Sequence, residues 1–396
     1  MRRLLASLIL VITAPLALAQ DDGVPTMTIG YLDMAEDPRY DEWGIHPVDI
    51  RSSTAIVDRR GLAGAELGME DLSHLKRVAE TLFAMDHARA TNTAEMLSEI
   101  ARMREAGAAV FVLDAPSKVV VEVSAALAVE NILLLNATAI GDSLRNEDCQ
   151  TNLFHVAASR AMLTDALAQH LKERNWQEVI VLQGPLAEDV ESVAAFTRSA
   201  DLFGLEIVDA RLFVLGNDPR AREMNDLDFL TGSEDYDAVF VADVHGEFAL
   251  SVPHRTRKPA PVVGASGLVP RIWHWSYTRH GAPQVHGRFE RLHSRRMGEA
   301  DWGAWVSMKA IGEAVARTKS RNVADIRDYF RSEKMRVDGS KGPGMSFRVW
   351  NNQLRQPIML ATQDWVSARA PIEGFKHRTN DLDTLGQSER EMACGF

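Results

Sequence analysis

The residues that could do chemistry are scattered along the chain and form no known catalytic pattern. Gly264-Ala265-Ser266-Gly267 is one residue short of the G-x-S-x-G nucleophile elbow, so we interpret Ser266 as a loop hydroxyl. The chain has no HExxH, CxxC, P-loop or G-x-G-x-x-G fingerprint. The densest histidine group shares no metal-ligand spacing; it comprises His245, His254, His274, His280 and His286. We therefore expect no catalytic residue, no metal and no cofactor.

Two segments of unusual composition each allow a second interpretation. The acidic stretch at residues 33–42 could attract a hard cation, but it lacks the ligand spacing of a calcium loop, which favours a solvated loop. The aromatic stretch 273–277 contains Trp273, His274, Trp275 and Tyr277. It could stack on a flat or apolar ligand. Packing at a crossover between two parts of the molecule is the favoured alternative.

Small polar residues instead follow directly after apolar runs of the sequence. In open α/β sheets, ligands bind outside the carboxyl ends of the strands. Hydroxyls, amides and helix-start N–H groups at those ends can hold the polar atoms of a small ligand. The residues that we predict to bind a ligand in this way are Ala115, Ser117, Asn136, Thr138, Gln183, Asp243 and Ser266.

Alternating strands and helices are expected to position these loops. The run Ala108–Leu113 has no polar alternation, which suits a parallel strand buried on both faces. Asn92 and Ser159 are placed to cap helices, and Gly107 and Gly204 to end them. Strands are expected at 27–32, 78–84, 108–113, 132–135, 179–182, 206–214, 238–242 and 262–263. This β/α alternation predicts an α/β fold with open parallel sheets that are covered by helices on both faces.

The number of expected strands exceeds one ordinary doubly wound sheet, so we predict two lobes, with a plausible boundary in the polar stretch 141–152. The C-terminal part has a different pattern. Trp302–Thr318 predicts a long helix, and Phe347–Trp350 with Ile358–Leu360 predicts a hairpin around residues 351–352. Residues 363–396 show little periodicity, which suggests an ordered tail that wraps the surface.

The N-terminus predicts export. Arg2 and Arg3 precede the apolar run Leu4–Ile12, and Ala17-Leu18-Ala19 is an A-x-A cleavage site, so we expect a signal peptide that is cleaved after Ala19. An N-terminal anchor is the alternative. Cleavage removes two arginines and takes the net charge from −11 to −13. An acidic surface argues against nucleic acid and anionic lipid as partners.

Two cysteines remain in the mature chain, Cys149 and Cys394. An oxidising compartment and an even count permit one disulfide, which would close a loop of about 245 residues and stabilise by roughly 5 kcal/mol at most. Two unpaired thiols are the alternative.

The order of these elements resembles the type I periplasmic binding proteins, specifically the branched-chain amino-acid receptors. Four phrases are similar to one subfamily, the ABC-transporter substrate-binding proteins associated with PQQ-dependent alcohol dehydrogenase systems. They lie at residues 159–169, 287–289, 347–358 and 382–386. The resemblance implies two doubly wound parallel-sheet lobes with a three-crossover hinge. It divides the chain into a signal peptide at 1–19, a first lobe at 20–155 and 275–335, a second lobe at 156–274 and 336–362, and a tail at 363–396.

The resemblance also implies a function: capture of a small ligand between the lobes, in the periplasm, for the membrane subunits of an ABC transporter. In that family, first-lobe hydroxyls hold the ligand carboxylate, and Ser117 and Thr138 stand at such positions. An acidic second-lobe residue normally meets the ammonium, but the neutral Ser266 stands there, although Asp243 could substitute. We therefore expect a ligand other than an ordinary amino acid. A non-transporting sensor or scaffold, and an enzyme or accessory protein of the dehydrogenase system, are the alternatives.

Overall fold

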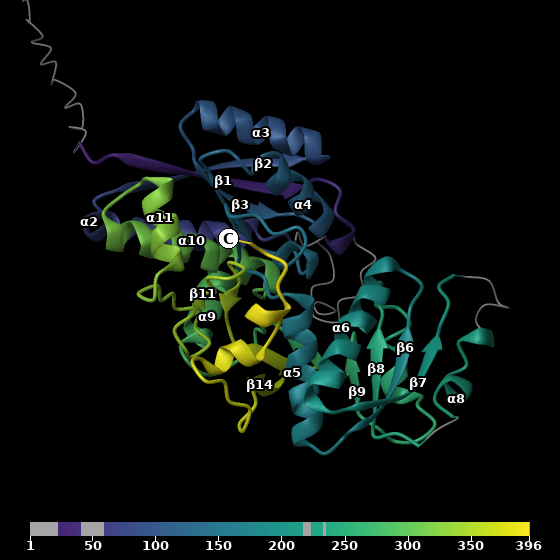
Figure 1. Ribbon diagram of the computed structural model, residues 1–396. Coiled ribbons are helices and arrows are strands. Elements are labelled where there is room, and N and C mark those ends of the chain that lie inside the picture. Colours follow the sequence, from purple (N-terminus) through teal and green to yellow (C-terminus); the bar gives the residue numbers. More distant parts are fainter. Residues whose placement is uncertain (1–22, 41–58, 217–222, 233–234, 396) are drawn as a thin grey trace, which may run out of the picture.

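The computed structural model describes residues 23–40, 59–216, 223–232 and 235–395, which form two α/β bodies (Figure 1). The predicted signal peptide lies outside the described residues, and so do Asp41 and Glu42. No helix in the described ranges is both long and apolar enough to cross a membrane.

Sheet A forms the first body, with five parallel strands in the order β2-β1-β3-β4-β5. The strands are β1 (Thr26–Met34), β2 (Leu82–Ala90), β3 (Val110–Asp114), β4 (Leu133–Asn136) and β5 (Leu153–His155). Both faces of β3 are buried, as its continuous apolar run predicts. Val110 and Val112 belong to one core cluster, while Phe111 and Leu113 belong to another on the opposite face.

Helices cover both faces of sheet A. Helices α3 (Thr93–Glu105) and α4 (Ser117–Ala126) contribute Met96, Ile100 and Val120 to the cluster around Phe111. Helices α1 (Leu62–Ser73) and α10 (Glu299–Thr318) pack on the other face, and α9 (Ala282–His293), α2 (Lys76–Ala79) and α11 (Val323–Arg331) adjoin them. Asn92 caps α3 by accepting a hydrogen bond from the Glu95 amide, which confirms the predicted helix start.

The packing of α1 on α10 is unusually close. A Cβ atom added at Gly64 would lie 1.9 Å from the main-chain oxygen of Asp301. One at Gly68 would lie 2.5 Å from the Cβ of Met308. Two glycines one helical turn apart thus let α1 press directly against α10.

Sheet B forms the second body, with four parallel strands in the order β7-β6-β8-β9. They are β6 (Glu178–Gln183), β7 (Glu206–Leu212), β8 (Ala238–Ala242) and β9 (Val262–Gly264). Helix α6 (Ala187–Phe203) packs on this sheet, α5 (Arg160–Glu173) packs on α6, and the short α8 (Leu227–Leu230) follows β7. Ser159 caps α5 through the Met162 amide, as predicted.

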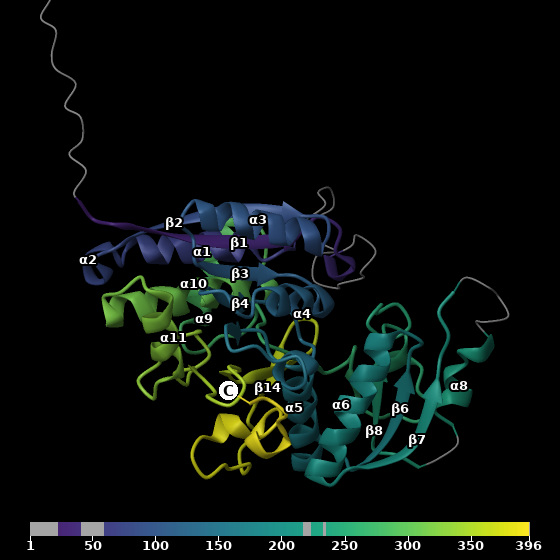
Figure 2. The same cartoon turned by 45° about the horizontal axis from the view of Figure 1, so that its top comes forward.

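Two small antiparallel sheets complete the fold. β10 (Val269–Arg271), β13 (Ile358–Ala361) and β14 (Val366–Ala370) form one, and β11 (Ser346–Phe347) with β12 (Leu354–Arg355) forms the other. Figure 2 shows the yellow C-terminal residues lying beside α5, and α5 contacts β10, β13 and β14.

Three expectations about these elements were wrong. The expected strand 78–84 is displaced, because Val78 belongs to α2 and β2 starts at Leu82. The polar stretch 141–152 does not separate the sheets, because β5 follows it and pairs with β4. The predicted hairpin turns at the expected place, but its second strand is β12, and Ile358–Leu360 pairs with β10 and β14 instead.

The central fold prediction is confirmed: the chain is α/β, with two separate parallel sheets. Cys149 and Cys394 form the permitted disulfide, with their Cα atoms 5.9 Å apart. We use first lobe for sheet A with its helices, and second lobe for sheet B with α5 and α6.

Candidate functional site

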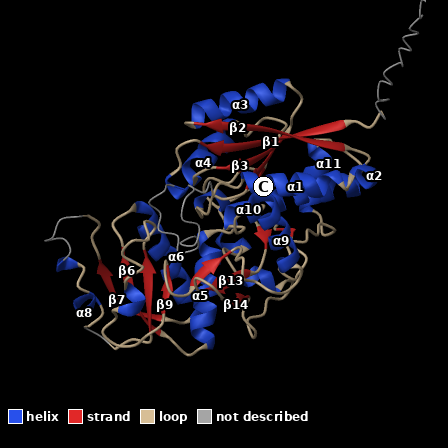
Figure 3. Cartoon of the chain, turned by 180° about the vertical axis from the view of Figure 1, so that it is seen from behind, coloured by secondary structure: helices blue, strands red, loops and turns tan. Residues whose placement is uncertain are grey.

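The carboxyl ends of the strands define the candidate site. Asp114 ends β3 and Asn136 ends β4 in the first lobe, whereas Gln183 ends β6 and Asp243 follows β8 in the second. In Figure 1 the arrowheads of β1 and β3 point to the right, and those of β6 and β8 point upward toward the first lobe; Figure 3 shows the same arrangement from behind. Each sheet therefore presents its carboxyl edge to the side on which the other lobe lies.

A polar cluster centred on Asp114 occupies the first-lobe edge. The Asp114 carboxylate is fully buried and accepts hydrogen bonds from Tyr40 Oη at 2.7 Å, Thr138 Oγ1 at 2.8 Å and Arg39 Nη2 at 3.1 Å. The Gly61 amide donates to it at 2.9 Å from the other side. These contacts compensate the desolvation of the carboxylate, so the cluster is a preformed structure.

Arg39 is the partly exposed member of this cluster. Its guanidinium forms a forked ion pair with Asp37, whose side chain is buried, and donates to Thr138 Oγ1 at 2.8 Å. Its side chain stays 29% exposed. Burial and the Asp114 carboxylate raise the pKa of Tyr40 well above 10, so its phenol keeps its proton and remains a donor. The hydroxyls of Tyr40 and Thr138 are thus engaged with Asp114, and the Arg39 guanidinium is the group of this cluster that remains partly exposed.

The remaining first-lobe predictions have structural roles in the described contacts. The Asn136 carboxamide accepts from the Thr138 and Ala139 amides and donates to the Ala139 carbonyl, which shapes the turn that holds Thr138. Ser117 Oγ accepts from the Gly141 amide at 3.1 Å, and Ala115 is fully buried. Of the four predicted first-lobe residues, the structure brings only Thr138 into the Asp114 cluster.

Two of the three predicted second-lobe residues are also engaged. Asp243 accepts from the Gly246 amide at 2.9 Å and the Ala249 amide at 2.8 Å, so its carboxylate closes the turn after β8. Ser266 Oγ donates to the Ala249 carbonyl at 2.6 Å, which supports its interpretation as a loop hydroxyl. Gln183 is partly exposed, and the hydrogen bonds within the described ranges leave its carboxamide unengaged. The ligand-binding role of all seven residues stays a prediction.

The second-lobe edge also carries exposed apolar side chains that the sequence analysis missed. Leu186 precedes α6, Val190 lies in its first turn and is 51% exposed, and Val244 follows β8 and is 56% exposed. The buried Asp189 carboxylate accepts from the Val244 amide at 2.7 Å and the Leu186 amide at 3.0 Å. It therefore holds these apolar side chains next to one another. Nothing in the sequence indicated that Leu186 and Val190 are exposed, because apolar residues at the start of an amphipathic helix have the same pattern as core residues.

In the two segments of unusual composition, 33–42 and 273–277, the structure shows buried, packed or paired side chains. Trp273 is buried in the core and stacks on Trp302 with ring centroids 6.5 Å apart, so it is a packing residue. Asp33 is buried and paired with Arg89 at 2.7 Å, and Asp37 is paired with Arg39. The described residues contain no group of three or more His, Cys, Asp or Glu side chains that could hold a metal ion.

A surface groove lies elsewhere, beside β14. Its volume is about 1010 Å³, and residues 276–279, 365–376 and 380–382 contribute most of its lining. None of the seven predicted ligand-binding residues lines it. The groove is therefore separate from the candidate site at the strand ends.

Comparison with known proteins agrees with this architecture. A family model described as Periplasmic binding protein matches residues 47–221. An amino acid ABC transporter substrate-binding protein from Pseudomonas fluorescens superposes with a TM-score of 0.70 at 11% identity, covering 94% of this chain and 100% of that one. A periplasmic binding protein from Burkholderia mallei gives 0.65 at 13% identity, covering 94% and 99%.

A third solved structure contains a ligand. It is the branched-chain amino acid transporter substrate binding protein from Streptococcus pneumoniae in complex with isoleucine, with a TM-score of 0.64 at 16% identity, covering 87% of this chain and 98% of that one. A sequence search of curated proteins finds no match. At these identities the structures establish a shared fold.

Proposed function

We propose that this protein is a periplasmic solute-binding protein that captures a small molecule between the carboxyl edges of its two sheets. The observation that carries the proposal is the pairing of a polar edge, where the partly exposed Arg39 guanidinium is held by the Asp37 and Asp114 carboxylates, with an apolar edge, Leu186 with Val190 and Val244. Ligand sites of this kind combine apolar walls with a few placed polar groups. The lobe boundaries expected above, with crossovers near 154–159, 268–276 and 335–348, belong to the same proposal.

The ligand is a small molecule with an apolar part and one hydrogen-bonding group, and it is not an ordinary amino acid. An ammonium group needs an acidic partner, and leaving it unpaired in a closed site is costly. Asp243 already accepts two backbone amides, and Ser266 is neutral. Aliphatic alcohols, aldehydes and short carboxylic acids fit the two edges better.

The wider role follows from the fold and the four sequence phrases described above. We propose that the chain is exported by cleavage after Ala19, delivers its ligand to the membrane subunits of an ABC transporter, and serves PQQ-dependent alcohol oxidation. The similarity of the fold to transporter-associated binding proteins supports the transport part. The proposed link to alcohol oxidation is supported by the resemblance of residues 347–358 and 382–386 to that subfamily.

Thermal unfolding of the mature chain should show which class of ligand binds. A ligand at 100 times its Kd raises the free energy of unfolding by about 2.7 kcal/mol, since it binds the folded state alone. We expect stabilisation by at least one alcohol, aldehyde or short carboxylic acid, and none by branched-chain amino acids. Arg39→Met should abolish the shift. Arg102→Met, which removes an exposed ion pair between α3 and Asp86 on β2, should leave the shift unchanged.

Two outcomes would contradict the proposal. Chemical conversion of the bound molecule would favour an enzyme of the dehydrogenase system. The absence of stabilisation by any of the three classes would favour a scaffold, and one observation supports that second candidate: the polar side chains of Asn136, Thr138, Asp243 and Ser266 are engaged in internal hydrogen bonds.

A further inference from the structure

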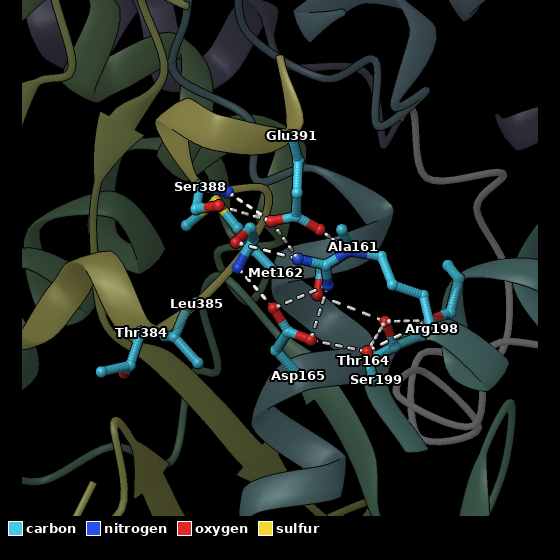
Figure 4. Close-up of polar contacts among 12 residues, drawn as sticks. Ala161, Met162, Thr164, Asp165, Arg198, Ser199, Thr384, Leu385, Ser388 and Glu391 are labelled. Carbon is cyan, nitrogen blue, oxygen red and sulfur yellow. Dashed lines mark hydrogen bonds and ion pairs between the residues drawn. The ribbon is translucent and has the colours of Figure 1, made fainter. Parts of the chain in front are cut away.

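The C-terminal residues 380–394, which we name the C-terminal strap, contact both lobes and the crossings between them. Figure 4 shows the second-lobe contacts. The Gly386 amide donates to Asp165 on α5 at 2.6 Å, and Glu391 forms a forked pair with Arg198 on α6 at 2.8 and 3.0 Å. Arg198 also donates to Asp165 at 3.0 Å. Two helices of the second lobe thus share one charge network with the strap.

The first residues of the strap are fixed to the hairpin β11–β12. The Arg348 side chain is 1% exposed and donates to Asp383, to the Leu382 carbonyl and to the Leu385 carbonyl. Arg355 donates to the same Asp383 carboxylate at 2.8 Å. Because these groups are buried, each lost contact would leave an unsatisfied charge or carbonyl.

The end of the strap is attached to the first lobe. The Ala393 amide donates to Asn146 Oδ1 at 2.6 Å, and Cys394 is bonded to Cys149. Both first-lobe partners lie in the segment between β4 and β5. The strap therefore starts at the hairpin, continues along α5 and α6 of the second lobe and ends covalently on the first lobe.

Little slack separates the last two attachments. Glu391 and Cys394 are three residues apart, so their Cα atoms can be at most about 11 Å from each other. Met392, between them, is already extended, with φ −86° and ψ 136°. Cys149 on the first lobe and Arg198 on α6 can therefore move apart only slightly before the Arg198–Glu391 pair or the disulfide breaks.

The crossings between the lobes are also cross-linked. Gln353 Nε2 donates to the Ala157 carbonyl at 2.9 Å, and Gln356 Nε2 donates to the Val156 carbonyl at 2.7 Å. The buried Lys341 ammonium donates to Ile272 O at 2.8 Å and to Gln356 Oε1 at 2.7 Å. Through Gln356 these bonds connect residues of all three proposed crossings.

We infer that the C-terminal strap is a limit stop for lobe movement: closed by Cys149–Cys394 and anchored by Glu391, it holds the α5–α6 pair of the second lobe at a nearly fixed distance from the first lobe. This inference concerns the range of motion and goes beyond the proposed function. A ligand can then bring the lobes together only within the small range of movement that the strap permits. The distance between the carboxyl edges of sheets A and B is therefore largely fixed before a ligand binds.

Small-angle X-ray scattering of the full mature chain tests the inference without a ligand. The oxidised parent should give one narrow distance distribution. Dithiothreitol cyclises to its disulfide as Cys149 and Cys394 take up two electrons and two protons. Reduced Glu391→Gln protein, which has lost both attachments, should show a larger radius of gyration and a broader distribution. Lys376→Met, which removes an exposed pair with Asp381 within the same C-terminal region, is the matched control and should behave like the parent after reduction.

Hydrogen exchange on the same samples separates release of the strap from general unfolding. We expect exchange at residues 383–394 to accelerate about tenfold while β3 and β8 keep their protection. A triple variant, Cys149→Ser with Cys394→Ser and Glu391→Gln, provides the same state without reductant. The inference is overturned if the strap amides are released and the scattering curve still superimposes on that of the oxidised parent. It is also overturned if the strap remains protected after both attachments are removed.

The Glu391 attachment should weaken in acid. Burial raises the pKa of Glu391, but hydrogen bonds from Arg198 and Ser388 outweigh burial and lower the pKa to about 2. Since the folded pKa lies below the usual 4.5, this contribution to stability is complete above pH 4.5 and is lost as the pH falls toward 2. Asp165 faces the same Arg198, and burial raises its pKa, so Asp165 takes up its proton at higher pH than Glu391 does.

This pH dependence is measured as the difference between two proteins. Strap exchange rates of the parent, followed from pH 6 downward, should approach those of Glu391→Gln between about pH 4.5 and 2. Comparison with the variant cancels the contribution of Asp165, which both proteins share. A constant difference across that range would contradict the assignment of the acid response to Glu391.

Discussion

Gly64→Ala should lower the free energy of unfolding by about 2 to 3 kcal/mol, although alanine is the better helix former. The new Cβ would lie 1.9 Å from Asp301 O and 2.5 Å from Asp301 Cα, and these are backbone atoms of α10 that cannot rotate away. The two helices must therefore separate, which opens the core that Leu67 and Met308 fill. Helix propensity alone predicts the opposite sign, a gain of about 1 kcal/mol.

Denaturant unfolding of the mature chain measures this effect. Glu66→Ala is the control, because Glu66 is exposed on the same helix and, among the described residues, forms an ion pair only with His293, at 3.7 Å. We expect a change within about 0.5 kcal/mol there. If Gly64→Ala were neutral or stabilising, the close approach of α1 and α10 would be disproved.

Arg348→Met should cost about 3 kcal/mol of unfolding free energy and also loosen the C-terminal strap. Methionine fills much of the space but cannot donate to Asp383 or to the Leu382 and Leu385 carbonyls, which remain buried. Arg355 still pairs with Asp383, so the loss stays below that of a wholly unpaired buried carboxylate. Calorimetry should show the lower transition, and hydrogen exchange should show faster exchange at residues 380–386.

Arg102→Met is the appropriate comparison for that variant. Arg102 pairs with Asp86 and Glu99, and its side chain is 49% exposed. An exposed pair contributes about 1 kcal/mol or less. Equal losses in the two arginine variants would mean that the buried contacts of Arg348 add nothing beyond surface charge pairing.

The sequence predicted most of the strands that are buried on both faces, because a run such as Val110–Leu113 has few other stable environments. Edge and glycine-containing elements were harder to predict. β2 is an edge strand whose first five residues are all partly buried and whose middle and second half contain Asp86, His87 and Arg89, so the assignment was placed on the more apolar segment at and before its start. Helix α1 was missed because Gly64 and Gly68 lower helix propensity, and only the contact with α10 explains them.

In the candidate site, too, one part could be predicted from the sequence and another could not. The strand ends were predicted because parallel strands place their carboxyl ends on one edge. The engagement of Thr138 by Asp114 and Arg39 could not be predicted, because it joins residues that are 24 and 99 positions apart in the chain. The burial of Lys341 could not be predicted for the same reason, because its acceptors come from residues 272, 356 and 357.

The position of α10 has a consequence for biosynthesis. The five strands of sheet A are complete at His155, but α10, which packs with α1 on the face lined by Val110 and Val112, does not begin until Glu299. A nascent chain must therefore be translated through about three quarters of its length before this apolar surface can be fully shielded from water. A fragment that ends at His155 carries every strand of its sheet and is still not an independent folding unit.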